Sequence, residues 1–151
     1  MSKIFYITLA VLYTIHAKAQ SPAAFKFNLN HIAISVKDVD RSAEFYRSVL
    51  NLEEITNRSK LEGVRWFSLG DGKELHLISI IKENVTLNKA LHLALSTNNF
   101  DDFVKRLDSL NMVYSDWAGT PHQLNIRADG VKQAFFQDPD GYWIEVNSIG
   151  K

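Results

Sequence analysis

The sequence has no cysteine and no excess of charge of either sign. The lack of cysteine excludes disulfide bonds, thiolate metal ligands and cysteine nucleophiles. Lys plus Arg and Asp plus Glu both number 17, and this balance argues against nucleic acid as a partner, because a nucleic-acid-binding surface is basic. The 151 residues are 46% hydrophobic and 23% charged, which is the length and composition of one ordinary globular domain.

The N-terminal segment, residues 1–19, has the pattern of a secretory signal peptide. A basic start at Lys3 precedes an apolar run from Ile4 to Ile15, and Ala17 and Ala19 form a small-residue cleavage site. The run is shorter than the roughly 20 residues that a membrane span needs. We predict cleavage after Ala19, which gives a secreted or periplasmic protein without a membrane anchor. A buried N-terminal helix or an uncleaved anchor is the alternative.

The rest of the chain contains an internal repeat. Residues His31–Ser35 read His-Ile-Ala-Ile-Ser, and residues His92–Ser96 read His-Leu-Ala-Leu-Ser. Both segments alternate as a strand with one buried face does, and an amphipathic helical stretch follows each of them. Residues Asp71–Leu77 and Asp140–Val146 form a second matching pair. Two such matches in the same order along the chain predict a duplicated unit.

Each copy of the repeat predicts the element order β-α-β-β-β. The expected N-caps of the two helices are Asp40 and Asn99. The strands expected after the helices are residues 52–56, 64–69 and 74–81 in the first copy, and 112–115, 122–127, 133–137 and 142–148 in the second. We therefore predict a single domain over residues 29–151, behind a loose tail at residues 20–28. Its two modules cover about residues 29–81 and 91–148.

Metal-binding side chains occupy matching strand positions in the two modules. They are His31, His76, His92 and Glu145, with Glu145 in the second module where His76 stands in the first. Imidazole and carboxylate suit a divalent transition metal, so we expect one Zn, Ni, Co, Fe or Mn ion. A lone histidine on a strand is more often a half-buried structural residue. Glu145, however, has apolar neighbours, and a buried carboxylate needs a partner or a metal.

With these residues the chain resembles the vicinal-oxygen-chelate superfamily of glyoxalases, bleomycin-resistance proteins and extradiol dioxygenases. The resemblance rests on Asn30–Val36, Asp40–Arg47, Leu50–Leu52, Glu74–Leu77, His92–Leu95 and Asp138–Val146. It implies an α+β fold in which two βαβββ modules form a cupped mixed sheet, with helices outside and a metal inside. It also implies that the first and last strands of each module carry the ligands, which here are His31, His76, His92 and Glu145.

The resemblance implies a catalytic role for a carboxylate at or near the metal, and Glu145 is the expected base. His76 stands where glyoxalase I-like members usually have a residue that acts like Glu or Gln, so one candidate base is missing. Glu74 shares a strand face with His76 and is a second candidate, although a solvated edge carboxylate is the simpler interpretation. His122 lies in an expected loop, so we interpret it as a loop residue or as part of the pocket rim.

Substrate contacts are harder to assign from the sequence. We expect Arg65, Trp66, Arg127 and Trp143 at the substrate, with Phe136 as a further wall of the pocket. Each of these residues also has a structural interpretation, because large aromatic side chains on strands are usually core and single arginines are usually surface charges.

The expected function is that of a metal-dependent lyase or isomerase of glyoxalase type, acting on a small oxygenated metabolite. A non-haem dioxygenase and a drug-sequestering resistance or binding protein of the same fold are the alternatives. Family members often exchange modules across a two-fold axis, so we also expect a homodimer. The four ligands then meet either within one chain or across two chains.

Overall fold

A computed structural model describes residues 25–81 and 83–150 of the chain. The first module consists of β1 (His31–Ser35), α1 (Val39–Ser48), β2 (Glu54–Ile55), β3 (Val64–Gly70) and β4 (Lys73–Ile78). The second consists of β5 (His92–Ser96), α2 (Phe100–Ser109), β6 (Asn125–Ile126), β7 (Lys132–Gln137) and β8 (Trp143–Asn147). The predicted signal peptide, residues 1–19, lies outside the described residues. Within them, neither helix is long and apolar enough to cross a bilayer.

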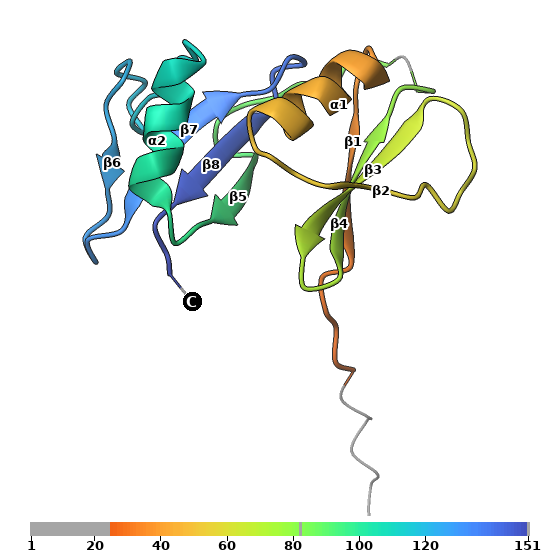
Figure 1. Ribbon diagram of the computed structural model, residues 1–151, viewed down its shortest axis with the longest axis horizontal. Coiled ribbons are helices and arrows are strands. Elements are labelled where there is room, and N and C mark those ends of the chain that lie inside the picture. The colour runs from red at the N-terminus through yellow and green to blue at the C-terminus, as the bar shows by residue number, and fades with distance from the viewer. Residues whose placement is uncertain (1–24, 82, 151) are drawn as a thin grey trace, which may run out of the picture.

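Each module forms one four-stranded mixed sheet (Figure 1). The strand order is β1-β4-β3-β2 in the first module and β5-β8-β7-β6 in the second, and in both the first and last strands of the module are parallel neighbours. The predicted α+β fold of two βαβββ modules is therefore confirmed. The strand expected at residues 112–115 is wrong, because this segment contributes only isolated bridges from Ser115 to Pro121 and Phe135.

The register of the central strands reproduces the sequence repeat. Ala33 on β1 lies opposite His76 on β4, and Ala94 on β5 lies opposite Glu145 on β8. His76 and Glu145 therefore occupy equivalent places in the two sheets. Their alternation with buried aliphatic neighbours places both on the sheet face that is turned away from the helices.

The N-cap of α1 is Asp38 rather than the expected Asp40. Asp38 has extended backbone angles, and its carboxylate accepts hydrogen bonds from the backbone N–H groups of Asp40 and Arg41. Asp40 lies in the first turn, where a negative charge is favourable near the helix N-terminus. Asn99 occupies the N-cap position of α2, as predicted.

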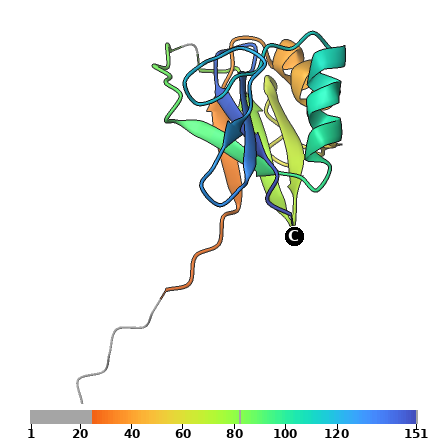
Figure 2. The ribbon, with the colours of Figure 1, turned by 90° about the vertical axis from the view of Figure 1, so that its left-hand side faces the viewer.

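One hydrophobic core serves both modules. It joins residues of α1, β3 and β4 to residues of α2, β7 and β8, and among the side chains it buries completely are Phe67, Leu107 and Ile144. The Phe45 ring of α1 packs against Phe136 of β7 with their centroids 6.4 Å apart. Figure 2 shows both helices gathered on one side of the molecule. The helix-covered faces of the two sheets thus contribute to one shared core, and the opposite faces lie outside it.

The turn between β7 and β8 fastens the second module to α1. The hydroxyl group of Tyr46 donates to Oδ2 of Asp138 at 2.9 Å, and the hydroxyl group of Ser42 donates to Oδ2 of Asp140 at 2.8 Å. Burial raises the pKa of Asp138, while the hydrogen bonds from the Tyr142 N–H and the Tyr46 hydroxyl oppose this shift. The Asp138–Gly141 segment, which is part of the family resemblance, therefore connects the two modules through hydrogen bonds to α1.

Candidate metal centre

The histidines of the first module form part of a stack of three rings. Because β4 lies between β1 and β3, the His76 ring lies between the rings of His31 and Trp66. The His31 ring is nearly parallel to it at 4.4 Å between centroids, with an interplanar angle of 11°. The Trp66 ring is nearly parallel at 4.0 Å and 6°. His76 is buried by this arrangement, whereas His31 remains exposed.

Hydrogen bonds to oxygen atoms orient both of these imidazoles. Nε2 of His76 lies 2.8 Å from Oε2 of Glu74, and Nδ1 of His31 lies 2.7 Å from Oδ1 of Asn30. Arg58 donates to the other oxygen of Glu74 at 2.6 Å and covers the Trp66 ring at 4.7 Å. The hydrogen bond from Arg58 lowers the pKa of Glu74, and the hydrogen bond from His76 lowers it further to a smaller extent.

The second module brings His92 and Glu145 together. Nε2 of His92 lies 3.3 Å from Oε2 of Glu145, and Glu145 is only 6% exposed. The amide of Asn147 donates to Oε1 of Glu145 at 2.8 Å. Nδ1 of His92 lies 2.9 Å from the carbonyl oxygen of Lys89 and donates to it. The predicted burial of this carboxylate is thus observed, together with two polar partners.

Lys89 secures the surroundings of His92. Its ammonium group donates to Oγ of Ser115, to the carbonyl oxygen of Trp117 and to that of Asp116. The same ammonium group lies 4.7 Å from the centre of the Phe135 ring and 4.8 Å from that of Trp143. Burial lowers the pKa of Lys89. Lys89 therefore holds the 115–117 loop against the sheet face that carries His92.

The donor set fits a divalent transition metal. A ring nitrogen that donates to an oxygen carries the proton and leaves the other ring nitrogen as a lone-pair donor. This leaves Nε2 in His31 and His92 and Nδ1 in His76, and Glu145 adds its Oε2. An outer hydrogen bond of this kind is the usual support of a metal-binding histidine.

The two pairs do not meet within one chain. Among the described residues, no three side chains of His, Asp or Glu lie close enough together to hold a metal ion. His31 and His76 belong to the sheet of the first module, and His92 and Glu145 to the sheet of the second. Each module therefore presents half of the predicted ligand set.

The expected substrate residues lie in three different places. Trp66 lies beside His76 and Trp143 lies beside His92, each on the same sheet face as its neighbour. Arg65 lies on the opposite face of β3, where it donates to Glu54 and to Asp40 of α1. Arg127 donates to Asp129 in the turn between β6 and β7. The structure thus brings the two tryptophans to the candidate centre and neither arginine.

Some residues at the centre were not expected from the sequence. Phe135, and not the predicted wall residue Phe136, faces His92, with ring centroids 5.7 Å apart, while Phe136 is buried in the core. Arg58 comes from the irregular segment between β2 and β3, and Lys89 from the segment between β4 and β5. Neither segment has a periodicity that would have predicted a contact with the histidines. His122 is exposed and lies 3.7 Å from Asp108, outside both pairs.

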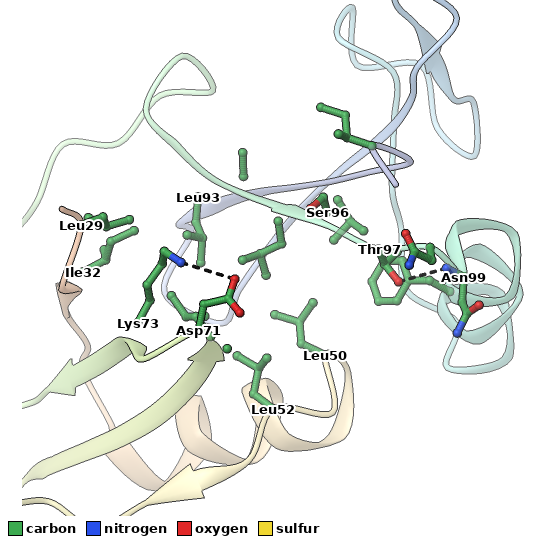
Figure 3. Close-up of a pocket in the computed structure, with 18 residues that line it drawn as sticks. Leu29, Ile32, Leu50, Leu52, Asp71, Lys73, Leu93, Ser96, Thr97 and Asn99 are labelled. Atoms are coloured by element: carbon green, nitrogen blue, oxygen red, sulfur yellow. Dashed lines mark hydrogen bonds and ion pairs between the residues drawn. The ribbon is translucent and has the colours of Figure 1, made fainter. Parts of the chain in front are cut away.

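A separate cavity of about 710 Å³ lies between the modules (Figure 3). Its lining combines apolar side chains, among them Ile32 and Leu93, with polar groups that include an ion pair of Asp71 with Lys73 at 3.6 Å. Ile32 and Leu93 follow His31 and His92 directly in their strands, so they point to the opposite sheet faces. This cavity is therefore distinct from the histidine pairs.

Comparison with known proteins agrees with this fold. Residues 28–146 match the Glyoxalase/Bleomycin resistance protein/Dioxygenase superfamily, and the chain belongs to that superfamily. Glyoxylase I 4 of Arabidopsis thaliana is 26% identical over 79% of this chain and 69% of its own length.

Two solved structures illustrate the similarity. A glyoxalase/dioxygenase from Nostoc punctiforme is 25% identical, with a TM-score of 0.64 over 82% of this chain and 92% of that chain. A lactoylglutathione lyase from Agrobacterium tumefaciens is 19% identical, with a TM-score of 0.62 over 85% of this chain and 96% of that chain. The sequence-based resemblance is thereby confirmed at the level of family and fold.

Proposed function

We propose that this protein is a metal-dependent lyase or isomerase of glyoxalase type that acts on a small oxygenated metabolite as a homodimer. In this proposal, His31 and His76 of one protomer and His92 and Glu145 of its partner hold one divalent cation. The observation that carries the proposal is the equivalent register of His76 and Glu145, each beside a first-strand histidine on the open sheet face. The names of the similar proteins, a glyoxylase I and a lactoylglutathione lyase, favour the same chemistry.

The arrangement of the sheets favours a site shared by two chains. The strands β1 and β5, which carry His31 and His92, are the outer strands of their sheets, so their free edges are open to a second copy. In a two-fold dimer, contact of β1 with the partner's β5 occurs twice. Such a dimer would complete two identical centres.

A divalent cation bound at this centre would act as a Lewis acid toward oxygen atoms of the substrate. Glu145 is the residue of this chain that would move the proton, since Asn147 holds only one of its oxygens and the other faces His92. Trp66, Phe135 and Trp143 line the same faces and would keep water away from the reacting atoms.

A dioxygenase is the second candidate, because two histidines and one carboxylate form a common Fe(II) site and the present set contains them. The similar protein from Nostoc punctiforme bears both names, glyoxalase and dioxygenase. Oxygen uptake with catechols would favour this candidate, and turnover of α-oxo thioesters or hydroxy acids without oxygen would favour the first. Tight binding of a drug by a protein that takes up no metal would favour sequestration over both.

Mixing two inactive variants tests the shared site. His76→Ala and Glu145→Ala each damage both centres of a homodimer, but a mixed dimer of the two contains one centre with all four ligands intact. After dissociation and reassociation, random pairing should restore about a quarter of the wild-type metal-binding sites. Calorimetric titration with Zn²⁺ and Co²⁺ would count these sites. No restoration in a mixture shown to contain mixed dimers would contradict the shared site, and a wild-type protein that binds neither metal nor Fe²⁺, Ni²⁺ or Mn²⁺ would contradict the proposed function.

A further inference from the structure

We propose that Glu74, held by Arg58, is a positioning residue that fixes the His76 ring with Nδ1 directed toward the cation. His31 and His92 would use Nε2 instead. The inference rests on the proposed function, and it assigns Glu74 a role other than that of the second candidate base.

The first step of the argument is the restraint on the His76 ring. Trp66 and His31 cover its two faces at 4.0 Å and 4.4 Å, so the ring has little freedom to tilt. The ring can still be flipped by 180°, which exchanges the positions of its nitrogen and carbon atoms. The hydrogen bond between Nε2 and Glu74 at 2.8 Å selects one of these two orientations. A carboxylate only accepts, so Nε2 carries the proton and Nδ1 keeps its lone pair.

The second step is the restraint on Glu74 itself. Its side chain is only 12% exposed, and its other oxygen accepts from Arg58 at 2.6 Å. The guanidinium group of Arg58 also covers the Trp66 ring, which is the ring that stacks on His76. Both carboxylate oxygens of Glu74 are thus engaged, one by His76 and the other by the guanidinium group of Arg58. This leaves Glu74 well placed to orient His76 and poorly placed to take a proton from a substrate.

The third step is the contrast with the second module. Glu74 lies opposite His31 in the register, and Trp143 lies opposite His92 in the equivalent place. The second module has no carboxylate there, and the carbonyl oxygen of Lys89 orients His92 through Nδ1. The first-strand histidines, His31 and His92, are therefore both supported through Nδ1, whereas His76 is supported through Nε2. A cation lies in the plane of each imidazole it binds, so the exposed His31 would turn out of the stack to share it. Trp66 would still cover one face of the His76 ring, and Glu74 would still hold its Nε2.

Nitrogen-15 NMR of the chelator-treated protein, with labelled histidine, tests the orientation without any metal or substrate. The expected spectrum shows His76 with a protonated Nε2 and an unprotonated Nδ1. In the wild-type protein loaded with ¹¹³Cd²⁺, coupling to the metal should appear at Nδ1 of His76 and at Nε2 of His31 and His92. Protonation of His76 at Nδ1, or coupling of the cadmium to its Nε2, would overturn the inference.

Substitutions separate positioning from a general effect on stability. Glu74→Ala should abolish the preference for one tautomer of His76 and weaken Cd²⁺ or Zn²⁺ binding about 10–100-fold. Glu74→Gln, whose amide oxygen still accepts from Nε2, should restore the tautomer and part of the affinity. Glu44→Gln is the matched control, since Glu44 forms a similar pair with Arg47 at 2.7 Å on the exposed face of α1.

The outcomes distinguish this inference from the proposed function. If Glu74→Ala keeps the wild-type tautomer of His76, Glu74 does not position the ring, whatever happens to metal affinity. If the wild-type protein binds no metal but shows the expected tautomer and loses it in Glu74→Ala, the role of Glu74 in orienting the ring stands and the proposed function fails.

Discussion

Nε2 of His92 lies 3.3 Å from Oε2 of Glu145, on the sheet face turned away from the helices. His92 and Glu145 come from the first and last strands of their module, which are parallel neighbours in the sheet. The duplicated order of elements therefore brings residues far apart in the sequence into contact. It does the same for His31 and His76 in the first module. Each pair lies within one module and uses equivalent strand positions, so the two pairs correspond to the two copies of the sequence repeat.

Replacement of Glu145 tests its assignment as the base. Glu145→Gln keeps the acceptor for Asn147 and a similar shape but removes the charge, so turnover should fall about 10²–10⁴-fold. The fold should be retained, because a neutral amide is easier to bury than a carboxylate. Turnover and bound metal should be measured on the same samples. Full activity in the variant would assign the base to another residue, and loss of bound metal would show that Glu145 acts as a ligand first.

The sequence was sufficient to predict the two βαβββ modules and the equivalent strand positions of His76 and Glu145. Alternation with a period of two assigned His31 and His92 to the same face of their strands. The second sequence match aligned His76 of the first module with Glu145 of the second. Both inferences depend on regular strands, where position along the chain determines which face a side chain occupies. The same regularity was not available for Phe135 and Phe136, because adjacent aromatic residues do not reveal which of them faces the core.

Other features depend on irregular segments or on a second chain, and the sequence pattern could not predict them. Arg58 and Lys89 reach the centre from connections without periodicity, where only the folded path of the chain determines the contact. Asp38 and Asp40 are both good N-caps, and the backbone angles at Asp38 decided between them. How the two half-sites meet depends on packing between sheets, which a repeat within one sequence does not specify.

Addition of metal should stabilise the folded protein. At a free concentration of 100 times Kd, a ligand that binds only the folded state adds about 2.7 kcal/mol to the free energy of unfolding. Melting curves of chelated protein with and without Zn²⁺ measure this gain as an increase in Tm. His31→Ala and His92→Ala should each lose most of the gain. His122→Ala is the control, because His122 lies outside both pairs and its variant should keep the wild-type increase. An equal loss in all three variants would argue against the assigned ligands.

Replacement of Lys89 should loosen the loop beside His92. Lys89→Met keeps an apolar side chain against Phe135 and Trp143 but removes the hydrogen bonds to residues 115–117. We expect a loss of about 1–3 kcal/mol in the free energy of unfolding, since the buried Ser115 hydroxyl and the half-buried carbonyl group of Asp116 lose their donor. Amide hydrogen exchange in residues 115–117 should become faster. Lys105→Met removes an exposed lysine that pairs with Asp102 and should change neither quantity.

The buried contact between Tyr46 and Asp138 predicts a stability that depends on pH. Burial raises the pKa of Asp138 in the folded state above its ordinary value. Between these two values the folded protein binds more protons than the unfolded one, so its stability decreases as the pH rises through this window. Tyr46→Phe removes a hydrogen bond that opposes the shift, so the folded-state pKa should rise further and the window should extend to higher pH.

Urea unfolding of the wild type and of Tyr46→Phe between about pH 4 and pH 7 tests this dependence. The variant should be less stable by about 1–3 kcal/mol near neutral pH, where Asp138 is ionised, and the difference should shrink as Asp138 is protonated at lower pH. With Asp138→Asn as the background, Tyr46→Phe should give a difference that no longer varies with pH. A difference that stays constant in the wild-type background would show that the hydroxyl of Tyr46 does not act through the charge of Asp138.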